Sequence, residues 1–338
     1  MVVGDPLAPV RLGRTALEVT RVGLGTAALG GLFAPVTAEL FAATVDTAWE
    51  LGLRLFDTAP LYGKGVAEAR LGVALAGRPR DAFVLSTKVG RLLRPDAPPD
   101  AETLRGLWHD APALNPVFDF SEEGVSRSFD ESLERLGLDR VDIALIHDPD
   151  DHHEQALAGA YPTLDRLRSE GVVGAVGVGS NRADVLYRFA RDTDVDCFLL
   201  AGRYTLLDQV GLRELLPLCV ERGIAVMVGG VYNSGILASP RPGATFNYEP
   251  ASQELVDRAL RLQGVCERHD VSLPAAAIQF PLAHPAVDAV VTGAASETEL
   301  RENVEHARSP LPAALWDDLR AEGLIPPEAP VPARSPAG

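Results

Sequence analysis

The sequence predicts an α/β fold, a (β/α)8 TIM barrel with an N-terminal β-hairpin and extra helices near the C-terminus. Short apolar runs alternate with amphipathic helical stretches along nearly the whole chain. No linker of different composition interrupts this alternation, so residues 1–325 are expected to form one domain. Three successive apolar runs end on a charged residue, which is typical of the strand ends at the active face of such a barrel.

The predicted elements run through the chain as a hairpin followed by strand and helix units with right-handed crossovers. In the first half the hairpin covers 10–20, the strands cover 22–25, 53–57, 83–88 and 141–147, and helices cover 37–51 and 121–136, with another ending at residue 75. In the second half the strands cover 172–178, 195–200, 225–228 and 289–291, and the helices 161–170, 183–190, 212–222, 253–269, 274–284 and 297–306.

Two segments do not fit the repeating units. The Pro-rich segment 94–99 lies in a long connection, which is typical of functional or mobile loops. The Pro- and Ala-rich segment 326–338 has little apolar surface to bury and is expected to be disordered.

Composition narrows the class of protein. The chain has 338 residues, 46% of them hydrophobic, which is enough for a large core. Its net charge of -16 disfavours nucleic acid or an anionic membrane surface as a partner, because phosphate binding needs clustered Lys and Arg. The amino terminus does not resemble a signal peptide, so we expect a cytoplasmic protein. Neither a disulfide framework nor a metal site is indicated by the cysteines, which are Cys197, Cys219 and Cys266.

Four residues form a candidate proton-transfer site. Asp57, Lys88 and His147 end three successive strands, and Tyr62 follows the first of them after a short turn. A lysine ammonium within reach of a phenol lowers its pKa from about 10 by roughly 1–3 units. Tyr62 would then be a usable general acid or base, with Asp57 holding Lys88 charged and oriented. His147 would hydrogen-bond a substrate oxygen, so the set suits proton transfer coupled to hydride transfer.

The surrounding motifs resemble those of the aldo-keto reductase family over about residues 12–303. That resemblance implies a nicotinamide-dependent oxidoreductase on a TIM barrel, with Asp57, Tyr62, Lys88 and His147 as its catalytic tetrad. The motifs that carry it are Asp57-Thr58-Ala59, Tyr62-Gly63, Glu68, Leu71-Gly72, Ser86-Thr87-Lys88 and Asp142-Ile143 through His147.

The same resemblance assigns the cofactor contacts. Ser180 and Asn181 match a pair that binds the nicotinamide carboxamide, although a helix cap explains them equally well. Two positions depart from the family: Ala201 stands where most relatives have Gln, and Gly229 stands where the ring-stacking Tyr is usual. Tyr232 is our hypothetical substitute for that Tyr. The full set of expected cofactor contacts is Gly25, Thr26, Ser180, Asn181, Tyr204, Gly229, Tyr232, Ser234, Gly235, Leu237, Gly293, Ala295, Glu299 and Asn303.

The adenosine end of the expected site predicts NAD. NADP-using relatives place Lys or Arg there to pair with the 2′-phosphate, whereas this chain has Gly293, Ala295 and Glu299. A carboxylate repels that phosphate but accepts hydrogen bonds from free ribose hydroxyls. The alternative is that Glu299 is a solvated residue in the first turn of a helix, near a favourable dipole end, and both readings can hold.

Within the family, residues 146–151, 201–209 and 229–237 resemble the aldose 1-dehydrogenase subgroup. That subgroup implies a small-molecule substrate, either a sugar such as a D-threo-aldose, L-fucose or L-galactose, or pyridoxal, and a monomer or homodimer. With a sugar, hydride would pass from the anomeric carbon to NAD and the lactone would result. A general aldehyde or ketone reductase of the same family is a further alternative. Asp148 is expected to contact the substrate. Trp108 either walls the pocket or packs on the surface.

Three other interpretations were weighed. Residues 147–153 look like a metal cluster, but the adjacent His152 and His153 should point apart, so no metal is predicted. Gly23-x-Gly25 mimics a dinucleotide fingerprint, yet the acidic partner Asp46 falls inside a helical pattern instead of at a strand end. A non-enzymatic alternative is a regulatory subunit that senses the nicotinamide state, which an intact tetrad disfavours.

Overall fold

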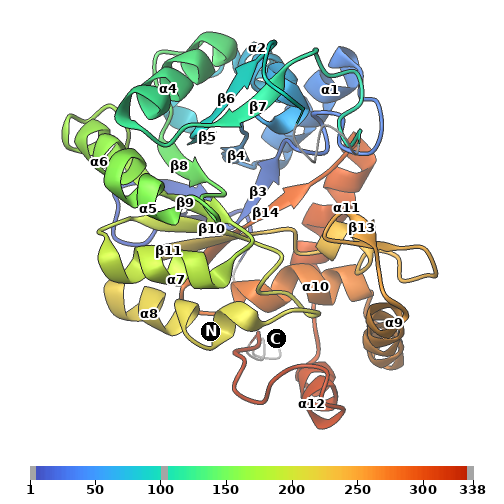
Figure 1. The fold of residues 1–338 in the computed structure, drawn as a ribbon. Coiled ribbons are helices and arrows are strands. Elements are labelled where there is room, and N and C mark those ends of the chain that lie inside the picture. Colours follow the sequence, from blue (N-terminus) through green and yellow to red (C-terminus); the bar gives the residue numbers. More distant parts are fainter. Residues whose placement is uncertain (1–4, 100–105, 333–338) are drawn as a thin grey trace.

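Eight parallel strands close into a barrel at the centre of the described chain, and helices surround it (Figure 1). The computed structural model describes residues 5–99 and 106–332. The strands follow one another in chain order around the ring, and pairing of β14 with β3 closes it, so the (β/α)8 prediction is confirmed. The barrel strands are β3 (Val22–Gly25), β4 (Leu55–Asp57), β5 (Val84–Val89), β8 (Ile143–His147), β9 (Ala175–Ser180), β10 (Cys197–Ala201), β11 (Ala225–Gly229) and β14 (Val287–Gly293).

Side chains alternate along each strand between the barrel interior and an outer layer beneath the helices. Leu145 of β8 and Leu199 of β10 belong to the interior cluster. Their neighbours Ile146 and Leu200 belong to the outer cluster. Because the period is two, this alternation also decides which way the last side chain of each strand faces.

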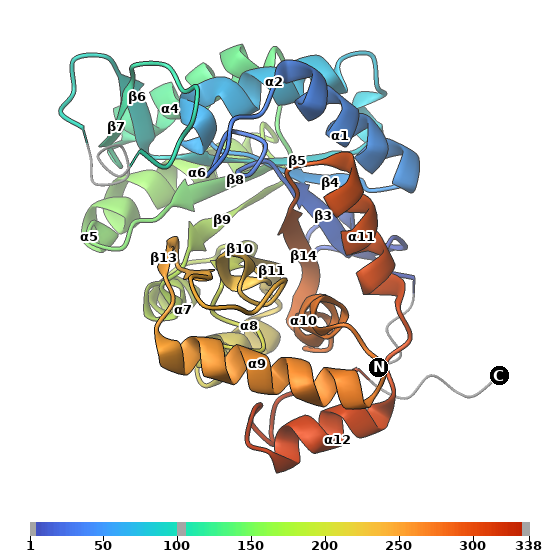
Figure 2. The ribbon, with the colours of Figure 1, turned by 90° about the vertical axis from the view of Figure 1, so that its right-hand side faces the viewer.

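Five of the eleven helices in the described residues begin at a hydroxyl cap. The Ser121 hydroxyl accepts a hydrogen bond from the Gly124 amide at the start of α4, and Ser296 does the same for the Glu299 amide at the start of α11. The helices α9 and α12 lie side by side outside the ring (Figure 2). The helices of the described residues are α1 (Ala38–Leu51), α2 (Val66–Leu75), α4 (Glu122–Leu136), α5 (His153–Gln155), α6 (Tyr161–Ser169), α7 (Ala183–Asp192), α8 (Leu215–Arg222), α9 (Gln253–Arg268), α10 (Leu273–Leu282), α11 (Glu297–Arg308) and α12 (Ala313–Ala321).

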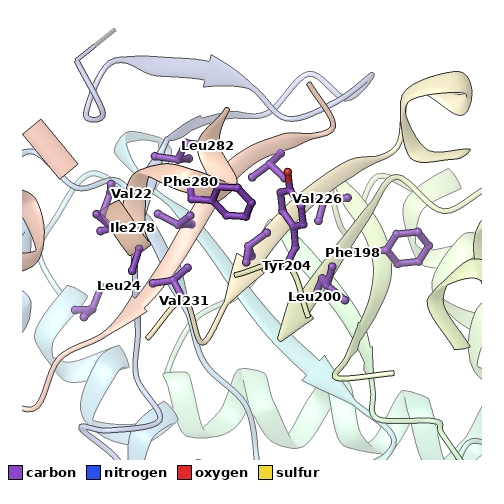
Figure 3. Packing of buried hydrophobic residues seen from close by; sticks show 14 of the residues in the cluster. Val22, Leu24, Phe198, Leu200, Tyr204, Val226, Val231, Ile278, Phe280 and Leu282 are labelled. Carbon is purple, nitrogen blue, oxygen red and sulfur yellow. The ribbon is translucent and has the colours of Figure 1, made fainter. Parts of the chain in front are cut away.

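The main core lies between the strands and the helices rather than inside the ring. Phe280 of α10 packs against Tyr204, which follows β10, whereas Phe198 of β10 points away from this pair (Figure 3). Trp316 of α12 extends this core and lies 6.2 Å from Phe280, measured between ring centroids, as expected for a packing residue. The residues that make this part of the core include Phe198, Leu200, Val226, Ile278, Phe280 and Leu282.

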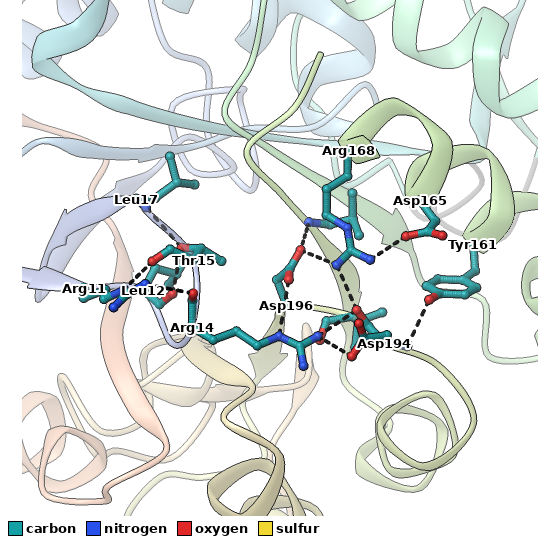
Figure 4. A network of polar contacts seen from close by, with 12 residues as sticks. Arg11, Leu12, Arg14, Thr15, Leu17, Tyr161, Asp165, Arg168, Asp194 and Asp196 are labelled. Carbon is teal, nitrogen blue, oxygen red and sulfur yellow. Dashed lines mark hydrogen bonds and ion pairs between the residues drawn. The ribbon is translucent and has the colours of Figure 1, made fainter. Parts of the chain in front are cut away.

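The predicted N-terminal hairpin is present and closes the bottom of the barrel. Its strands β1 (Pro9–Arg11) and β2 (Glu18–Thr20) pair antiparallel. Leu12 and Val19 from this hairpin are buried within the interior cluster, so they plug the N-terminal ends of the strands. Beside it a polar network joins Arg14 and Arg168 to Asp194 and Asp196 (Figure 4).

The structure adds two small hairpins that the sequence analysis did not predict. Strands β6 (Arg91–Arg94) and β7 (Asn115–Phe118) pair within the long connection after β5, and β12 (Thr245–Phe246) pairs with β13 (Glu249–Pro250) in the connection after β11. The sequence analysis predicted only a long connection between β5 and α4. The pairing was not visible in the sequence because its two halves are separated by the Pro-rich segment.

The expected disorder of segment 326–338 is not observed in the part that the structure describes. Residues 326–332 pack against the body: Ala329 is fully buried, and its carbonyl accepts a hydrogen bond from Arg320 at 2.8 Å. Val331 also packs against the core and Pro332 is buried, so several apolar contacts and this backbone bond dock a proline-rich segment that has no secondary structure. Residues 333–338 lie outside the described residues. In the part that is described, no helix has the length and apolar character that crossing a bilayer requires.

Candidate active site

The alternation of the barrel strands brings three charged or polar side chains to one place. Asp57 is two residues beyond the inward Leu55, and His147 is two residues beyond the inward Leu145. Lys88 is four residues beyond the inward Val84, which keeps the same alternation. All three therefore face the barrel axis at the C-terminal ends of adjacent strands. Each is at least nine-tenths buried.

Lys88 and Asp57 form a buried ion pair. The Lys88 Nζ donates to Asp57 Oδ1 at 3.0 Å, to Asp57 Oδ2 at 2.8 Å and to the Thr58 carbonyl at 2.9 Å. Burial raises the pKa of the Asp57 carboxyl, and the adjacent ammonium of Lys88 acts in the opposite direction. Three acceptors around one ammonium fix its position, so its charge is held at a defined point below the barrel mouth.

Tyr62 completes the cluster from the turn after β4. It begins the 3-10 turn Tyr62–Gly65, in which Gly63 has φ +58°. A Cβ at Gly63 would lie 2.4 Å from the Gly30 carbonyl oxygen, so only glycine allows this turn. The Lys88 Nζ lies 4.6 Å from the centroid of the Tyr62 ring, and the His147 ring meets that ring edge-on at 6.1 Å between centroids. The structure thus brings together the four residues that the sequence analysis grouped.

His147 is held in the neutral form. Burial, with the positive charges of Arg91 and Lys88, lowers the pKa of His147 well below its usual 6.5. Its Nδ1 is buried and has no hydrogen-bond partner among residues 5–99 and 106–332. A neutral imidazole in contact with a substrate oxygen donates a hydrogen bond without adding a charge.

The two predicted substrate residues lie next to this cluster. The Trp108 ring is 6.0 Å from the Tyr62 ring, between centroids, so it lies beside the tetrad, as expected for a residue of the pocket wall. Asp148 is 30% exposed, and its Oδ2 lies 3.5 Å from His147 Nε2. Sequence reasoning missed Arg91, whose Nη2 donates to the same Asp148 oxygen at 2.5 Å. The sequence feature that could have identified Arg91 is a charged residue inside the apolar run that follows Lys88.

Small residues end the other five barrel strands. The inward position at the end of each is a glycine or an alanine, whereas β4, β5 and β8 end on Asp57, Lys88 and His147. A Cβ at Gly25 would lie 3.0 Å from Val291 Cγ1, and one at Gly229 would lie 3.2 Å from Leu199 Cδ2. Side chains at these two positions would crowd the mouth, so glycine leaves room there for a flat ring beside the tetrad. The five small residues are Gly179, Ala201, Gly229, Gly293 and Gly25.

Thr26, Ser180 and Asn181 lie around this open side. The Thr26 hydroxyl donates to the Asp57 carbonyl at 3.1 Å, and the Ser180 hydroxyl donates to Asp150 Oδ1 at 2.6 Å. Neither Ser180 nor Asn181 caps α7, because Arg182 is the N-cap residue and no side-chain bond caps that helix. The helix-cap alternative is therefore wrong. Asn181 is exposed, and its carbonyl accepts a bond from Arg203 at 2.9 Å.

The expected adenosine contacts gather at the start of α11. The Glu299 carboxylate accepts a hydrogen bond from the Ala295 amide at 2.8 Å, and Asn303 Nδ2 donates to the Gly293 carbonyl at 3.2 Å. Glu299 is exposed and lies in the first turn of α11, so the structural explanation for it holds. That bond leaves acceptor capacity on the carboxylate for another donor.

Three of the expected cofactor contacts need correction. Tyr204 is fully buried in the outer core, where its ring lies 5.2 Å from Phe280, between centroids, and points away from the mouth (Figure 3). Tyr232 packs against the outer cluster, and burial, with a smaller contribution from the Glu302 carboxylate of α11, raises the pKa of its hydroxyl. This position does not support stacking on a nicotinamide. Leu237 is buried, and its amide donates to the Tyr232 carbonyl at 3.1 Å.

These corrections have one physical cause. Each residue follows the end of a strand, where the turn and not the alternation of the strand decides the direction of the side chain. Ser234 and Gly235 stay near the surface of the same connection, and Gly235 is exposed. The Gly235 amide already donates to the Tyr232 carbonyl at 3.0 Å, so Ser234 is the remaining candidate for contact with a phosphate group through its backbone amide.

The histidines of segment 147–153 do point apart, as the sequence analysis predicted. The His152 ring lies 5.0 Å from Phe118, and the His153 ring lies 4.8 Å from Phe189, in each case between centroids. Among residues 5–99 and 106–332, no group of three or more His, Cys, Asp or Glu side chains could hold a metal ion.

Known proteins share this arrangement. Residues 21–321 match the Aldo/keto reductase family. A D-threo-aldose 1-dehydrogenase from Pseudomonas sp is 44% identical over 315 residues, which are 92% of this chain and 96% of the relative. A pyridoxal 4-dehydrogenase from Microbacterium luteolum is 44% identical over 333 residues, with 93% and 97% coverage. The solved holo form of aldo-keto reductase AKR11C1 from Bacillus halodurans has a TM-score of 0.76 at 25% identity, covering 96% of this chain and 97% of that one. This chain belongs to the aldo/keto reductase family of nicotinamide-dependent oxidoreductases.

Proposed function

We propose that the protein oxidises the anomeric carbon of an aldose with NAD and releases the lactone. The observation that carries the proposal is the buried Lys88 and Asp57 pair, with its ammonium 4.6 Å from the Tyr62 ring and His147 against the same ring. A phenol, an ammonium and a neutral imidazole around one point suit the removal of a proton from a hydroxyl. They provide no strong nucleophile for hydrolysis or acyl transfer.

In the proposed mechanism each residue has one task. The Lys88 ammonium stabilises the phenolate of Tyr62, which accepts the proton of the anomeric hydroxyl. His147 donates a hydrogen bond to the same oxygen and orients it, while Asp57 holds Lys88 in place. The chemistry supplied by a bound nicotinamide is acceptance of the hydride from carbon one. The products are a lactone, NADH and a proton.

The strand ends with small side chains would hold the nicotinamide. Gly25, Gly229 and Gly293 place no side chain at the mouth, and a Cβ at the first two would meet side chains of the interior cluster. Ser180 and Asn181 offer polar atoms on the same side. The remainder of the cofactor would extend past Ser234 and Gly235 to α11.

The preference for NAD rests on the charge at the start of α11. Glu299 places a carboxylate there, bonded to the Ala295 amide, and neither Gly293 nor Ala295 offers a cation for a 2′-phosphate. Replacing Glu299 by Gln keeps the acceptor for that amide and removes the charge. We expect the ratio of kcat/KM for NAD over NADP to fall by roughly threefold to tenfold in Glu299→Gln. Equal or better turnover of the wild-type protein with NADP would contradict the assignment.

Pyridoxal is the second candidate substrate. The support for it is that the aldose dehydrogenase and the pyridoxal dehydrogenase named above match this chain with the same identity of 44%. Both reactions remove a hydride from a carbon and a proton from the hydroxyl on that carbon, so the tetrad serves either one. The two candidates differ in the groups next to that carbon.

The test is an NADH-formation assay with L-fucose, L-galactose, other aldoses and pyridoxal, with NAD and NADP in separate runs. We expect aldose-dependent NADH formation that falls roughly 100- to 10,000-fold in Tyr62→Phe. Tyr161→Phe is the matched control, because it removes a hydroxyl that accepts a bond from the Asp194 amide at the opposite end of the barrel. Activity that survives Tyr62→Phe would exclude the proposed role of Tyr62.

A further inference from the structure

A second ion pair lies beside the tetrad, between Arg91 of β6 and Asp148 after β8. The Arg91 Nη2 donates to Asp148 Oδ2 at 2.5 Å, and that oxygen is 3.5 Å from His147 Nε2. Arg91 is only 6% exposed, and its guanidinium carbon lies 4.7 Å from the centroid of the Phe118 ring. The carboxylate is therefore held between a fixed cation and the tip of the imidazole.

At both members of this ion pair the backbone adopts a conformation that few residues allow. Gly90 has φ +94°, and a Cβ there would lie 2.2 Å from the Phe120 ring, so only glycine can turn the chain from β5 into β6 at this point. Asp148 itself is a non-glycine residue with φ +43°, and its amide donates to the Gly179 carbonyl at 2.9 Å. Strained positions of this kind persist where the surroundings over-determine them, and they cluster at functional sites.

A substrate hydroxyl on the carbon next to the reacting one would lie beside Asp148. If Tyr62 and His147 both contact the oxygen on carbon one, a hydroxyl on the next carbon fits between that oxygen and the Asp148 carboxylate. In an aldose, the oxygen on carbon two lies within hydrogen-bonding length of the oxygen on carbon one. A partly exposed carboxylate accepts such a bond strongly, because one partner is charged.

We propose that Asp148 binds the substrate by accepting a hydrogen bond from the hydroxyl on carbon two, and that Arg91 is a positioning residue that holds this carboxylate beside His147. The inference rests on the proposed aldose dehydrogenase function and deepens it. It makes the substrate class an aldehyde or hemiacetal with a hydroxyl on the adjacent carbon. Substrates without that hydroxyl lack this charge-assisted bond and are bound less tightly.

The experiment compares a sugar with its 2-deoxy form. The probes are L-fucose or L-galactose, whichever the wild-type protein oxidises faster, and the corresponding 2-deoxy sugar, with kcat and KM measured separately. In Asp148→Asn we expect kcat/KM for the parent sugar to fall about 10- to 100-fold. Most of this change should appear in KM, because the bond is made in the bound substrate as well as in the transition state. For the 2-deoxy sugar the fall should be less than about threefold, so the preference for the parent sugar collapses.

Arg91 is tested through the same ratio. Arg91→Met should lower the preference for the parent sugar in the same direction as Asp148→Asn, and Arg91→Lys should restore part of it because the charge is kept. The matched control is Arg94→Met. Arg94 lies in the same strand and forms a bidentate pair with Glu131 of α4, at 2.9 and 3.2 Å, so the control removes a tether of the same hairpin away from His147. The control should leave the ratio unchanged, with melting temperatures measured for all variants.

The outcomes separate the inference from the function on which it rests. Wild-type activity on the parent sugar with an unchanged ratio in Asp148→Asn would overturn the inference alone. Equal losses for both sugars in Asp148→Asn, or equal effects of Arg91→Met and Arg94→Met on the ratio, would mean that the Arg91 and Asp148 pair only stabilises the structure. Either result would also overturn the inference. A wild-type protein that oxidises no aldose with either cofactor would overturn the proposed function and the inference together.

Discussion

The two ends of the barrel each bury a carboxylate against a cation, but they complete its bonding in different ways. At the bottom, Asp196 Oδ2 accepts bonds from Arg168 at 2.8 Å and from the Val176 amide at 2.9 Å (Figure 4). Arg14 approaches the other Asp196 oxygen at 3.6 Å. Here the carboxylate is bonded on both sides by groups of the protein itself.

At the mouth, the Lys88 and Asp57 pair is equally well bonded, but not all the buried polar atoms around the pair have hydrogen bonds. His147 Nδ1 and Trp108 Nε1 are buried without a hydrogen-bond partner in the described parts of the chain. Buried polar atoms are nearly always paired in folded proteins, so such atoms at a barrel mouth indicate groups that a ligand or water completes. The comparison teaches that a similar ion pair serves stability at one end and substrate chemistry at the other.

The largest expected effect comes from Lys88→Met. The Tyr62 phenolate loses its stabilising charge, so kcat should fall roughly 100- to 10,000-fold. Asp57 is left buried without its cation, which should also lower the free energy of unfolding by about 3–5 kcal/mol. Steady-state rates and urea unfolding measure the two effects. A kcat within tenfold of the wild-type value would show that the ion pair at the mouth is not needed for the reaction.

Arg168→Met is the counterpart at the bottom. It removes the main cation of Asp196, and we expect the free energy of unfolding to fall by about 2–4 kcal/mol, less than at the mouth because Arg168 is partly exposed. The kcat of the folded protein should stay within about twofold of the wild type, since the change lies at the stability face of the barrel. A loss of activity comparable to that of Lys88→Met would show that the two ends are coupled.

A pH experiment sharpens the comparison, because each end holds a neutral buried histidine. His284 lies in the turn before β14, and burial lowers its pKa from 6.5 to about 4. Its Nδ1 accepts a bond from the Ala286 amide at 3.1 Å. Between these pKa values the unfolded chain binds a proton that the folded chain does not, so stability is present above pH 6.5 and is lost as the pH falls towards 4.

In His284→Asn the side-chain oxygen can replace Nδ1 as acceptor, but nothing titrates. The loss of unfolding free energy between about pH 7 and pH 4 should therefore be smaller than in the wild type by about 2–3 kcal/mol. Urea unfolding at the two pH values measures it. Identical pH dependence in both proteins would show that His284 contributes nothing to acid sensitivity.

The smallest effect is expected for Asp194→Asn in the bottom network. Asp194 is 61% exposed, and its Oδ1 accepts from Arg14 at 2.6 Å. Exposed pairs contribute little, so the free energy of unfolding should change by less than about 0.5 kcal/mol. Thermal and urea unfolding give the value. A cost close to that of Arg168→Met would mean that burial does not separate the strong pairs of this network from the weak ones.

Much of the fold was predictable because its signals are local. Apolar runs and helical periodicity located the eight barrel strands, and the N-terminal hairpin was recognised from its own twelve or so residues. The tetrad was also predictable, because Asp57, Lys88 and His147 end strands whose alternation must turn them inward once the barrel closes. The β6 and β7 hairpin was not predicted, since its pairing depends on residues on both sides of a long loop.

The sequence by itself determined the order of the elements, the barrel and the inward direction of Asp57, Lys88 and His147, because alternation along a strand is a property of the local chain. Only the tertiary structure decided where Tyr204 and Tyr232 point, that Arg91 meets Asp148, and that residues 326–332 dock on the body. Those directions are set in turns and between distant segments. Their energy comes from packing partners that no local pattern contains.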